Sequence, residues 1–157
     1  ARRGLAGLRA ARHAVAGRDP ASLLASANVV PLPARRALDT RDGTGFPGAP
    51  AGPLDAGGVV TLRVAGQAGI PDTAVGVVAT VAVLDATYNG FVTAYAADGA
   101  EGTAAVSCYF ADGGSPSAAQ VLVGFGSGSY AGQVSLHLSD AVVGTAQLLL
   151  DIVAYLA

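Results

Sequence analysis

Three amino acids are missing from this sequence, and a fourth occurs only once. The 157 residues include no lysine, methionine or tryptophan, and Cys108 is the only cysteine. One thiol cannot form an intrachain disulfide, which excludes the small secreted folds that disulfides hold together. Cys108 falls in a predicted strand, so we expect a buried and unreactive thiol.

Long apolar runs are missing as well. The longest run, near Leu148–Leu156, is interrupted by Asp151 and is too short to cross a membrane as a helix. Four basic residues between positions 9 and 18 break up the apolar sequence near the N-terminus, so we predict no secretory signal. The chain begins with Ala1, and removal of an initiator methionine or of a leader would each explain this.

Apolar residues are nevertheless abundant, at 52% of the chain. The densest stretch runs from Val75 to Tyr95. Its first part has β-branched residues at period two and apolar residues on both faces, which predicts a strand buried on both sides. Asn89–Gly90 favours a turn because both residues tolerate positive φ. The stretch therefore predicts two antiparallel strands in the middle of an all-β domain.

Six more strands are predicted around this central pair, separated by turns rich in Gly and Asp. Residues 43–58 form a Pro/Gly loop that is too long for a hairpin. Eight strands with short turns predict a jelly-roll-like β-sandwich over residues 34–157. The six further strands are expected at residues 34–42, Val59–Val64, Thr103–Phe110, Ala119–Phe125, Gln133–Ser139 and Gln147–Tyr155.

Residues 1–33 are predicted to form a basic, partly helical N-terminal arm. Residues 1–41 hold eight arginines against two acids, a net charge of +6, whereas the rest holds one arginine against nine acids, a net of −8. A basic arm on an acidic body favours an arm docked on a neighbouring subunit, and the alternative is a solvated tail. The residues expected to contact the partner are Arg2, Arg3, Leu5, Leu8, Arg9, Arg12 and Arg18.

No group of residues predicts catalysis or a cofactor. His13 and His137 lie far apart in the sequence, and His137 is expected on the surface of a strand. No Cys/His metal spacing occurs. The Gly-rich run from Gly124 to Tyr130 is followed by no helix, so it predicts a flexible hairpin and not a phosphate loop. Acidic residues in turns could bind calcium only loosely. We expect a non-enzymatic protein without metal or cofactor.

Three charged residues lie in otherwise apolar predicted strands: Asp39, Arg41 and Asp151. A buried carboxylate must be paired or hydrogen-bonded. The first and last strands of a closed sandwich often lie together, so we predict an ion pair between Asp151 and Arg41, with Arg36 as the second choice. The alternative is that these residues form a ligand site.

Four motifs occur in a fixed order along residues 34–157: LDTR at Leu38–Arg41, VTLRVAGQAGIP at Val60–Pro71, NGFVTAYAADG at Asn89–Gly99 and LLLDIVAYL at Leu148–Leu156. This order resembles a β-rich module that recurs in actinobacterial surface and secreted proteins and in their phages. Thr80–Ala82, Ser107–Phe110 and Ala154–Leu156 depart from the pattern of that module. The resemblance carries over no catalytic residue and implies an accessory or surface module.

These features support two functional hypotheses. The first is a structural or decorating subunit of an actinobacterial phage particle, in which the basic arm anchors a displayed β-sandwich. Its partners would be protein subunits of the same assembly, with a homotrimer expected and with neither membrane nor nucleic acid as partner. The second is a secreted cell-surface module that binds carbohydrate or cell wall. The location would be the virion or the extracellular surface.

Overall fold

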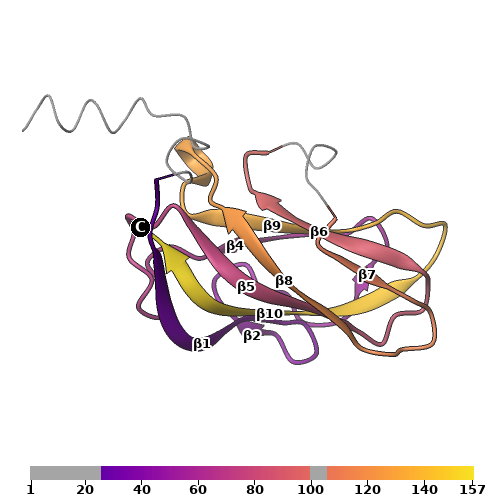
Figure 1. The fold of residues 1–157 in the computed structure, drawn as a ribbon. Helices are drawn as coiled ribbons and strands as arrows, with labels where there is room; N and C mark the ends of the chain where they lie inside the picture. The colour runs from indigo at the N-terminus through magenta and orange to yellow at the C-terminus, as the bar shows by residue number, and fades with distance from the viewer. Residues whose placement is uncertain (1–25, 100–105) are drawn as a thin grey trace, which may run out of the picture.

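The computed structural model of the chain describes residues 26–99 and 106–157, which form two antiparallel sheets packed face to face (Figure 1). The large sheet has the order β2-β1-β10-β5-β8, with β3 also paired to β10, and the small sheet has the order β4-β9-β6-β7. The strands are β1 (Val29–Asp39), β2 (Thr44–Gly45), β3 (Leu54–Asp55), β4 (Val59–Arg63), β5 (Gly76–Leu84), β6 (Gly90–Ala96), β7 (Cys108–Phe110), β8 (Ser117–Gly124), β9 (Gln133–Leu138) and β10 (Thr145–Leu156).

Strand pairing follows a simple rule when the two-residue strands β2 and β3 are left aside. The first strand pairs with the last, β1 with β10, and the next pairs inward are β4 with β9, β5 with β8 and β6 with β7. Successive pairs alternate between the large and the small sheet. The chain therefore forms a long antiparallel ribbon that is rolled up so that its strand pairs alternate between the two sheets. Each half of the chain supplies two of these longer strands to each sheet.

The core lies between the sheets and is built by the alternation of strand side chains. In β4, Val60 and Leu62 are buried, and Val64 just after the strand is buried too. In β5, Val77, Ala79, Val81 and Val83 are fully buried. The opposite face of β5 is only half-buried. The prediction that this strand is buried on both sides is therefore wrong, because no described segment forms a further layer over the outer face of the large sheet there.

Strand β1 begins at Val29, five residues before the predicted start, so residues 29–33 belong to the sheet although we had assigned them to the arm. Pro31 and Pro33 lie within the strand. Strand β2 pairs only with Leu38 and Asp39 of β1, so the first half of β1 has no neighbour among the described strands on its outer side. Proline is tolerated there because its missing N–H is not needed for pairing.

Strands β5 and β6 do not form the predicted hairpin. Strand β5 lies in the large sheet between β10 and β8, whereas β6 lies in the small sheet between β9 and β7. The turn at Asn89–Gly90 instead belongs to a connection that crosses between the sheets. Gly90 has no positive φ. A Cβ at Gly90 would lie 2.4 Å from Ser139 Oγ, so glycine is required by close packing against the end of β9.

Two other expectations about loops need correction. The Gly-rich run after β8 does not form a hairpin, because β8 and β9 lie in different sheets and the 3₁₀ turn η2 (Gly128–Tyr130) lies between them. The Pro/Gly loop at residues 43–58 contains the short strands β2 and β3. The helical arm and its seven named contact residues lie outside the described residues. Among the residues that are described, no helix has the length and hydrophobicity to span a membrane.

Replacing Val81 by Asp is expected to prevent folding. Val81 is fully buried and lies opposite Leu150 of β10 and Ala119 of β8, so the new carboxylate would be buried without a partner. Such a charge costs several kcal/mol against a total stability of roughly 5–15 kcal/mol. Circular dichroism and thermal melting measure the effect. Val142→Asp, at a fully exposed loop position, is the matched control and should fold normally. An unchanged melting temperature for Val81→Asp would contradict the assignment of β5 to the core.

Candidate functional site

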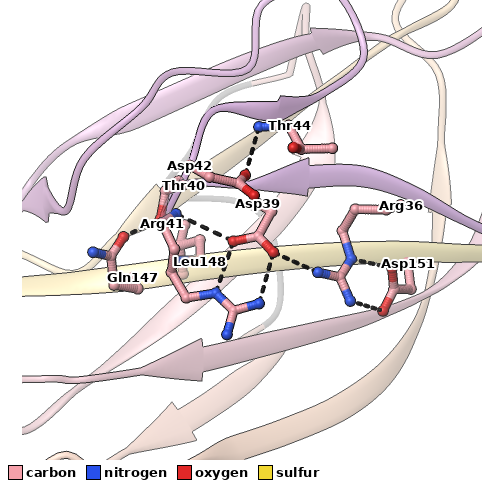
Figure 2. Close-up of polar contacts among 9 residues, drawn as sticks. All are labelled: Arg36, Asp39, Thr40, Arg41, Asp42, Thr44, Gln147, Leu148 and Asp151. Atoms are coloured by element: carbon pink, nitrogen blue, oxygen red, sulfur yellow. Dashed lines mark hydrogen bonds and ion pairs between the residues drawn. The ribbon is translucent and has the colours of Figure 1, made fainter.

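The charged residues that stand out in the sequence meet at the seam between β1 and β10 (Figure 2). Arg36 and Asp39 come from β1, Arg41 from the turn after it, and Asp151 from β10. Arg36 and Asp39 are three residues apart, so in a regular strand they would point to opposite faces. The pairing of β1 with β10 is irregular between Arg36 and Leu38, and this irregularity places both side chains on the same side.

Asp39 is the centre of this cluster. Its carboxylate accepts hydrogen bonds from Arg41 Nε at 2.9 Å, Arg41 Nη2 at 2.7 Å, the Arg41 backbone N–H at 3.1 Å and Arg36 Nη1 at 2.6 Å. Its side chain is only 6% exposed, whereas Arg41 covers it from the solvent side and is half-exposed. The side-chain hydrogen bonds from Arg41, followed by its backbone N–H and the nearby charges, hold the pKa of Asp39 well below its usual range.

Asp151 pairs with Arg36. Arg36 Nε lies 2.5 Å from Asp151 Oδ1 and Nη2 lies 3.1 Å from Oδ2, a two-pronged contact between residues directly opposite each other in the strand pair. The hydrogen bond and charge of Asp151 raise the pKa of Arg36. The predicted pairing of the first and last strands through Asp151 is confirmed, but the preferred partner, Arg41, is wrong. Arg41 is bound instead to Asp39, which lies two residues before it in the sequence.

Asp151 is also less buried than expected. Its side chain is 34% exposed and that of Arg36 is 35% exposed, so the pair lies at the surface of the large sheet. None of the residues that the structure describes forms a further layer over the outer face of β10, which is why a carboxylate is tolerated in this apolar strand. No deeply buried, unsatisfied carboxylate exists here that would require a ligand.

The remaining residues of the LDTR motif also stabilise the seam. Leu38 is fully buried in the core. Thr40 donates its hydroxyl hydrogen to Gln147 Oε1 at 2.5 Å and accepts a hydrogen bond from the Leu148 N–H at 2.9 Å. Gly43 closes the turn with φ +77°, a conformation that favours glycine, and donates its N–H to the Asp39 carbonyl. Within the motif, Thr40 therefore bonds the first strand directly to the last, whereas Asp39 and Arg41 bond to each other at the end of the first strand.

The VAGQAGIP segment closes the other end of the sandwich. Gly66 donates its N–H to the Ile70 carbonyl at 2.9 Å, and the Ile70 N–H donates to the Gln67 carbonyl at 2.8 Å. Ile70 is buried in the core. Gly66 has φ +80°, and a Cβ there would lie 2.6 Å from Asp72 Oδ1. Asp72 is paired with Arg63 at 3.2 Å. This motif is a tight turn that places Ile70 in the core between the sheets.

The other candidate residues are buried or hydrogen-bonded within the fold. His137 is buried, contrary to expectation, because it lies in β9 between Val59 of β4 and Thr93 of β6. Cys108 is buried as predicted, and burial raises the pKa of its thiol. Asp98 accepts hydrogen bonds from Ser127, whose hydroxyl chiefly lowers the pKa of that carboxyl. Within residues 26–99 and 106–157, no three acidic, His or Cys side chains are grouped as metal ligands.

A strongly acidic end is a feature that the sequence analysis did not locate. Five aspartates lie at or after strand ends, at the end of the sandwich where β10 begins. Among the described residues, Arg41 is the only cation at this end. At the opposite end, Asn28 and the last residue, Ala157, exchange two backbone hydrogen bonds of 2.7 and 3.0 Å. The described chain therefore begins at the end of the sandwich far from these acids. The five are Asp42, Asp55, Asp85, Asp112 and Asp140.

Comparison of the chain with models of protein families and with curated proteins yielded no match. The resemblance to an actinobacterial β-rich module stays a prediction that rests on the order of the four motifs.

A double-mutant cycle is expected to detect the Arg36–Asp151 pair. Arg36→Gln and Asp151→Asn should show a coupling energy of about 0.5–1 kcal/mol in chemical denaturation, because both side chains are one-third exposed and solvent screens the pair. The matched control is the cycle of Arg41→Gln with Asp151→Asn, which should be nearly additive. Coupling in the control but not in the first cycle would mean that Asp151 contacts Arg41 instead.

The stability of the protein is expected to fall in acid partly through Asp39. A carboxylate whose pKa is lowered by folding stabilises the fold above its unfolded pKa, roughly 3.9, and this contribution is lost as the pH falls toward the folded value. Asp39→Asn should therefore be less stable by about 1–3 kcal/mol at pH 7 and should show a flatter loss of stability between about pH 5 and 3. Urea denaturation across this range measures both. Asp140→Asn, an exposed loop residue, should leave the acid dependence unchanged; equal slopes for wild type and Asp39→Asn would refute the role of Asp39.

Proposed function

We propose that the chain is a non-enzymatic structural or decorating subunit of a large assembly, a virion protein of an actinobacterial phage. The single observation that carries the proposal is the charge contrast between the basic N-terminal residues and the acidic sandwich. The described chain begins at the end where Asn28 meets Ala157, and five aspartates lie at the other end. An arm anchored on oppositely charged neighbours would leave the acidic end of the sandwich displayed outward.

The order of strand pairing supports a jelly-roll-like architecture for this subunit. A jelly roll has eight strands in two Greek keys, and viral capsid proteins are among its common users. The pairs β1–β10, β4–β9, β5–β8 and β6–β7, divided alternately between two sheets, are the pairs that a rolled antiparallel ribbon makes. Fold alone does not imply function, so this point supports the proposal only together with the charge separation.

The use of the motif residues also supports a structural role. In the LDTR and VAGQAGIP segments, the polar and charged groups are bound to each other or to the backbone, and their apolar groups fill the core. No buried side-chain nitrogen or oxygen in the described part of the chain lacks a hydrogen-bond partner. The motifs are thus accounted for by folding, and the interaction with a partner is left to the surface and to the arm. The partners would be other subunits of the assembly, including further copies of this chain.

One observation favours the second candidate, a secreted module that binds carbohydrate or cell wall. Tyr109 and Tyr130 are 72% and 47% exposed, and aromatic rings of this kind can stack on sugars. Tyr109→Ala should then weaken co-sedimentation with purified cell walls at least tenfold. If the variant and the wild type sediment equally, or neither binds, the phage proposal is preferred.

Removal of the arm is expected to separate anchoring from folding. Deletion of residues 1–25 spares Asn28 and all of β1, so the truncated chain should keep the circular dichroism spectrum and the melting temperature of the full chain. It should not be incorporated when it is expressed with the other proteins of its assembly. A longer deletion, of residues 1–30, would remove the first two residues of β1 and would confuse the result.

A control variant tests whether charge is what anchors the arm. Replacing Arg2, Arg3, Arg9, Arg12 and Arg18 by Gln keeps the length of the arm and removes its charge. It should be excluded from particles like the truncated chain, as judged by electron microscopy with antibodies against the sandwich. Incorporation of both variants at the level of the full chain would refute anchoring by the arm.

A further inference from the structure

The two sheets have four lateral edges, and three of them are protected from pairing with other chains. The edge at β1 carries Pro31, Pro33 and Arg35, which discourage strand addition. The edge at β4 is covered by the preceding loop, where Arg63 donates its N–H to the Pro47 carbonyl at 3.0 Å. The edge at β7 is only three residues long. Each of these features is a known way in which proteins prevent unwanted sheet extension.

Among the described residues, the edge at β8 has none of these protections. It is eight residues long, contains no proline and no charged residue, and pairs with β5 over its whole length without a register shift. Among the described strands β8 has a neighbour only on the side of β5 (Figure 1). A long, uncharged and regular edge of this kind is a template for another strand.

The direction of the backbone groups can be deduced from the pairing with β5. Phe125 donates its N–H to the Val75 carbonyl at 2.9 Å, in continuation of the register that places Gly124 opposite Gly76. In an antiparallel pair, alternate residues bond to the neighbouring strand. The odd-numbered residues of β8 therefore bond to β5, and the N–H and C=O groups of Ala118, Gln120 and Leu122 point outward.

The surroundings of this edge are uncharged and partly apolar. Leu122 is 62% exposed. A groove of about 400 Å³ runs between β8 and β6, and none of the described residues that line it, which include Val106, Val121 and Leu122, is charged. The described part of the chain otherwise holds nine aspartates against four arginines. Like charges on the described residues would therefore repel two copies across most of their surfaces, but not at the edge of β8.

We propose that two copies of this chain pair through β8, antiparallel, across a two-fold axis near Gln120. The two large sheets then form one continuous sheet. In this register Gln120 faces its own counterpart, and Leu122 lies opposite Ala118, which joins a large side chain to a small one. An isologous contact of this type closes on itself and yields a dimer. The dimer goes beyond the proposed role in an assembly, and it replaces the expected three-fold arrangement with a two-fold one.

Sedimentation equilibrium of the full chain tests the dimer. The wild type should have twice the monomer mass at micromolar concentration. Gln120→Pro removes an outward N–H that β5 does not use, and Leu122→Lys adds a charge at the edge, so each should be a monomer with an unchanged circular dichroism spectrum. Val142→Lys, at a fully exposed apolar position away from the edge, is the matched control and should remain a dimer. If Gln120→Pro fails to fold, Leu122→Lys alone decides.

A cross-link tests the register. Residues directly opposite each other in an antiparallel pair have Cβ atoms about 4.5–5.5 Å apart. Gln120→Cys should therefore form a disulfide-linked dimer on mild oxidation, whereas Val142→Cys should not, and the native Cys108 is buried. A monomeric wild type, a trimer, or a dimer that Leu122→Lys leaves intact would overturn the proposal. Because none of these measurements involves the arm or the assembly, their failure would leave the proposed function standing.

Discussion

The large sheet depends on the pairing of the first strand with the last. Strand β10 lies between β1 and β5, so without it these two strands would have no contact with each other. Three of the four ion pairs among the described residues lie at or beside this seam. Arg36 bonds to Asp151, and Thr40 bonds to Gln147 and to the Leu148 backbone. Asp39 holds the two arginines together at the end of the seam. Apolar burial supplies the main driving force, and these bonds specify which strands meet.

The sequence predicts the features that depend on neighbouring residues. Local patterns predict the burial of Cys108 and the approximate positions of the longer strands, and the structure confirms these, although β1 begins at Val29 and β7 begins only at Cys108. The partners of the strands do not follow from such patterns. Asn89–Gly90 looks like a hairpin turn, yet close packing of Gly90 against Ser139 explains the glycine. The choice of Arg36 over Arg41 depends on an irregularity in β1 that no local pattern reveals.

The motif residues and the surface of the molecule therefore have different roles. The motif residues that attract attention in the sequence are used to hold the ends of the strands, and their polar groups bind one another. The proposed interaction surfaces are the basic N-terminal residues, the acidic end and the edge at β8. The charge contrast is visible in composition, but only the fold shows that the aspartates gather at the end of the sandwich opposite Asn28. The edge is visible only after the strands are ordered.

The central position of β10 has a consequence for synthesis of the protein on the ribosome. Of the described strands β1 comes first along the chain, but Asp151 of β10, which bonds to Arg36, follows 115 positions later. The large sheet cannot close until β10 has left the ribosomal exit tunnel, because β10 lies between β1 and β5. Contacts this distant in sequence make folding slow, because the entropy of closing the long loop is lost before the strand pairs form. A nascent chain would meanwhile expose apolar edges of both β1 and β5, and a premature stop near the C-terminus would make that exposure permanent.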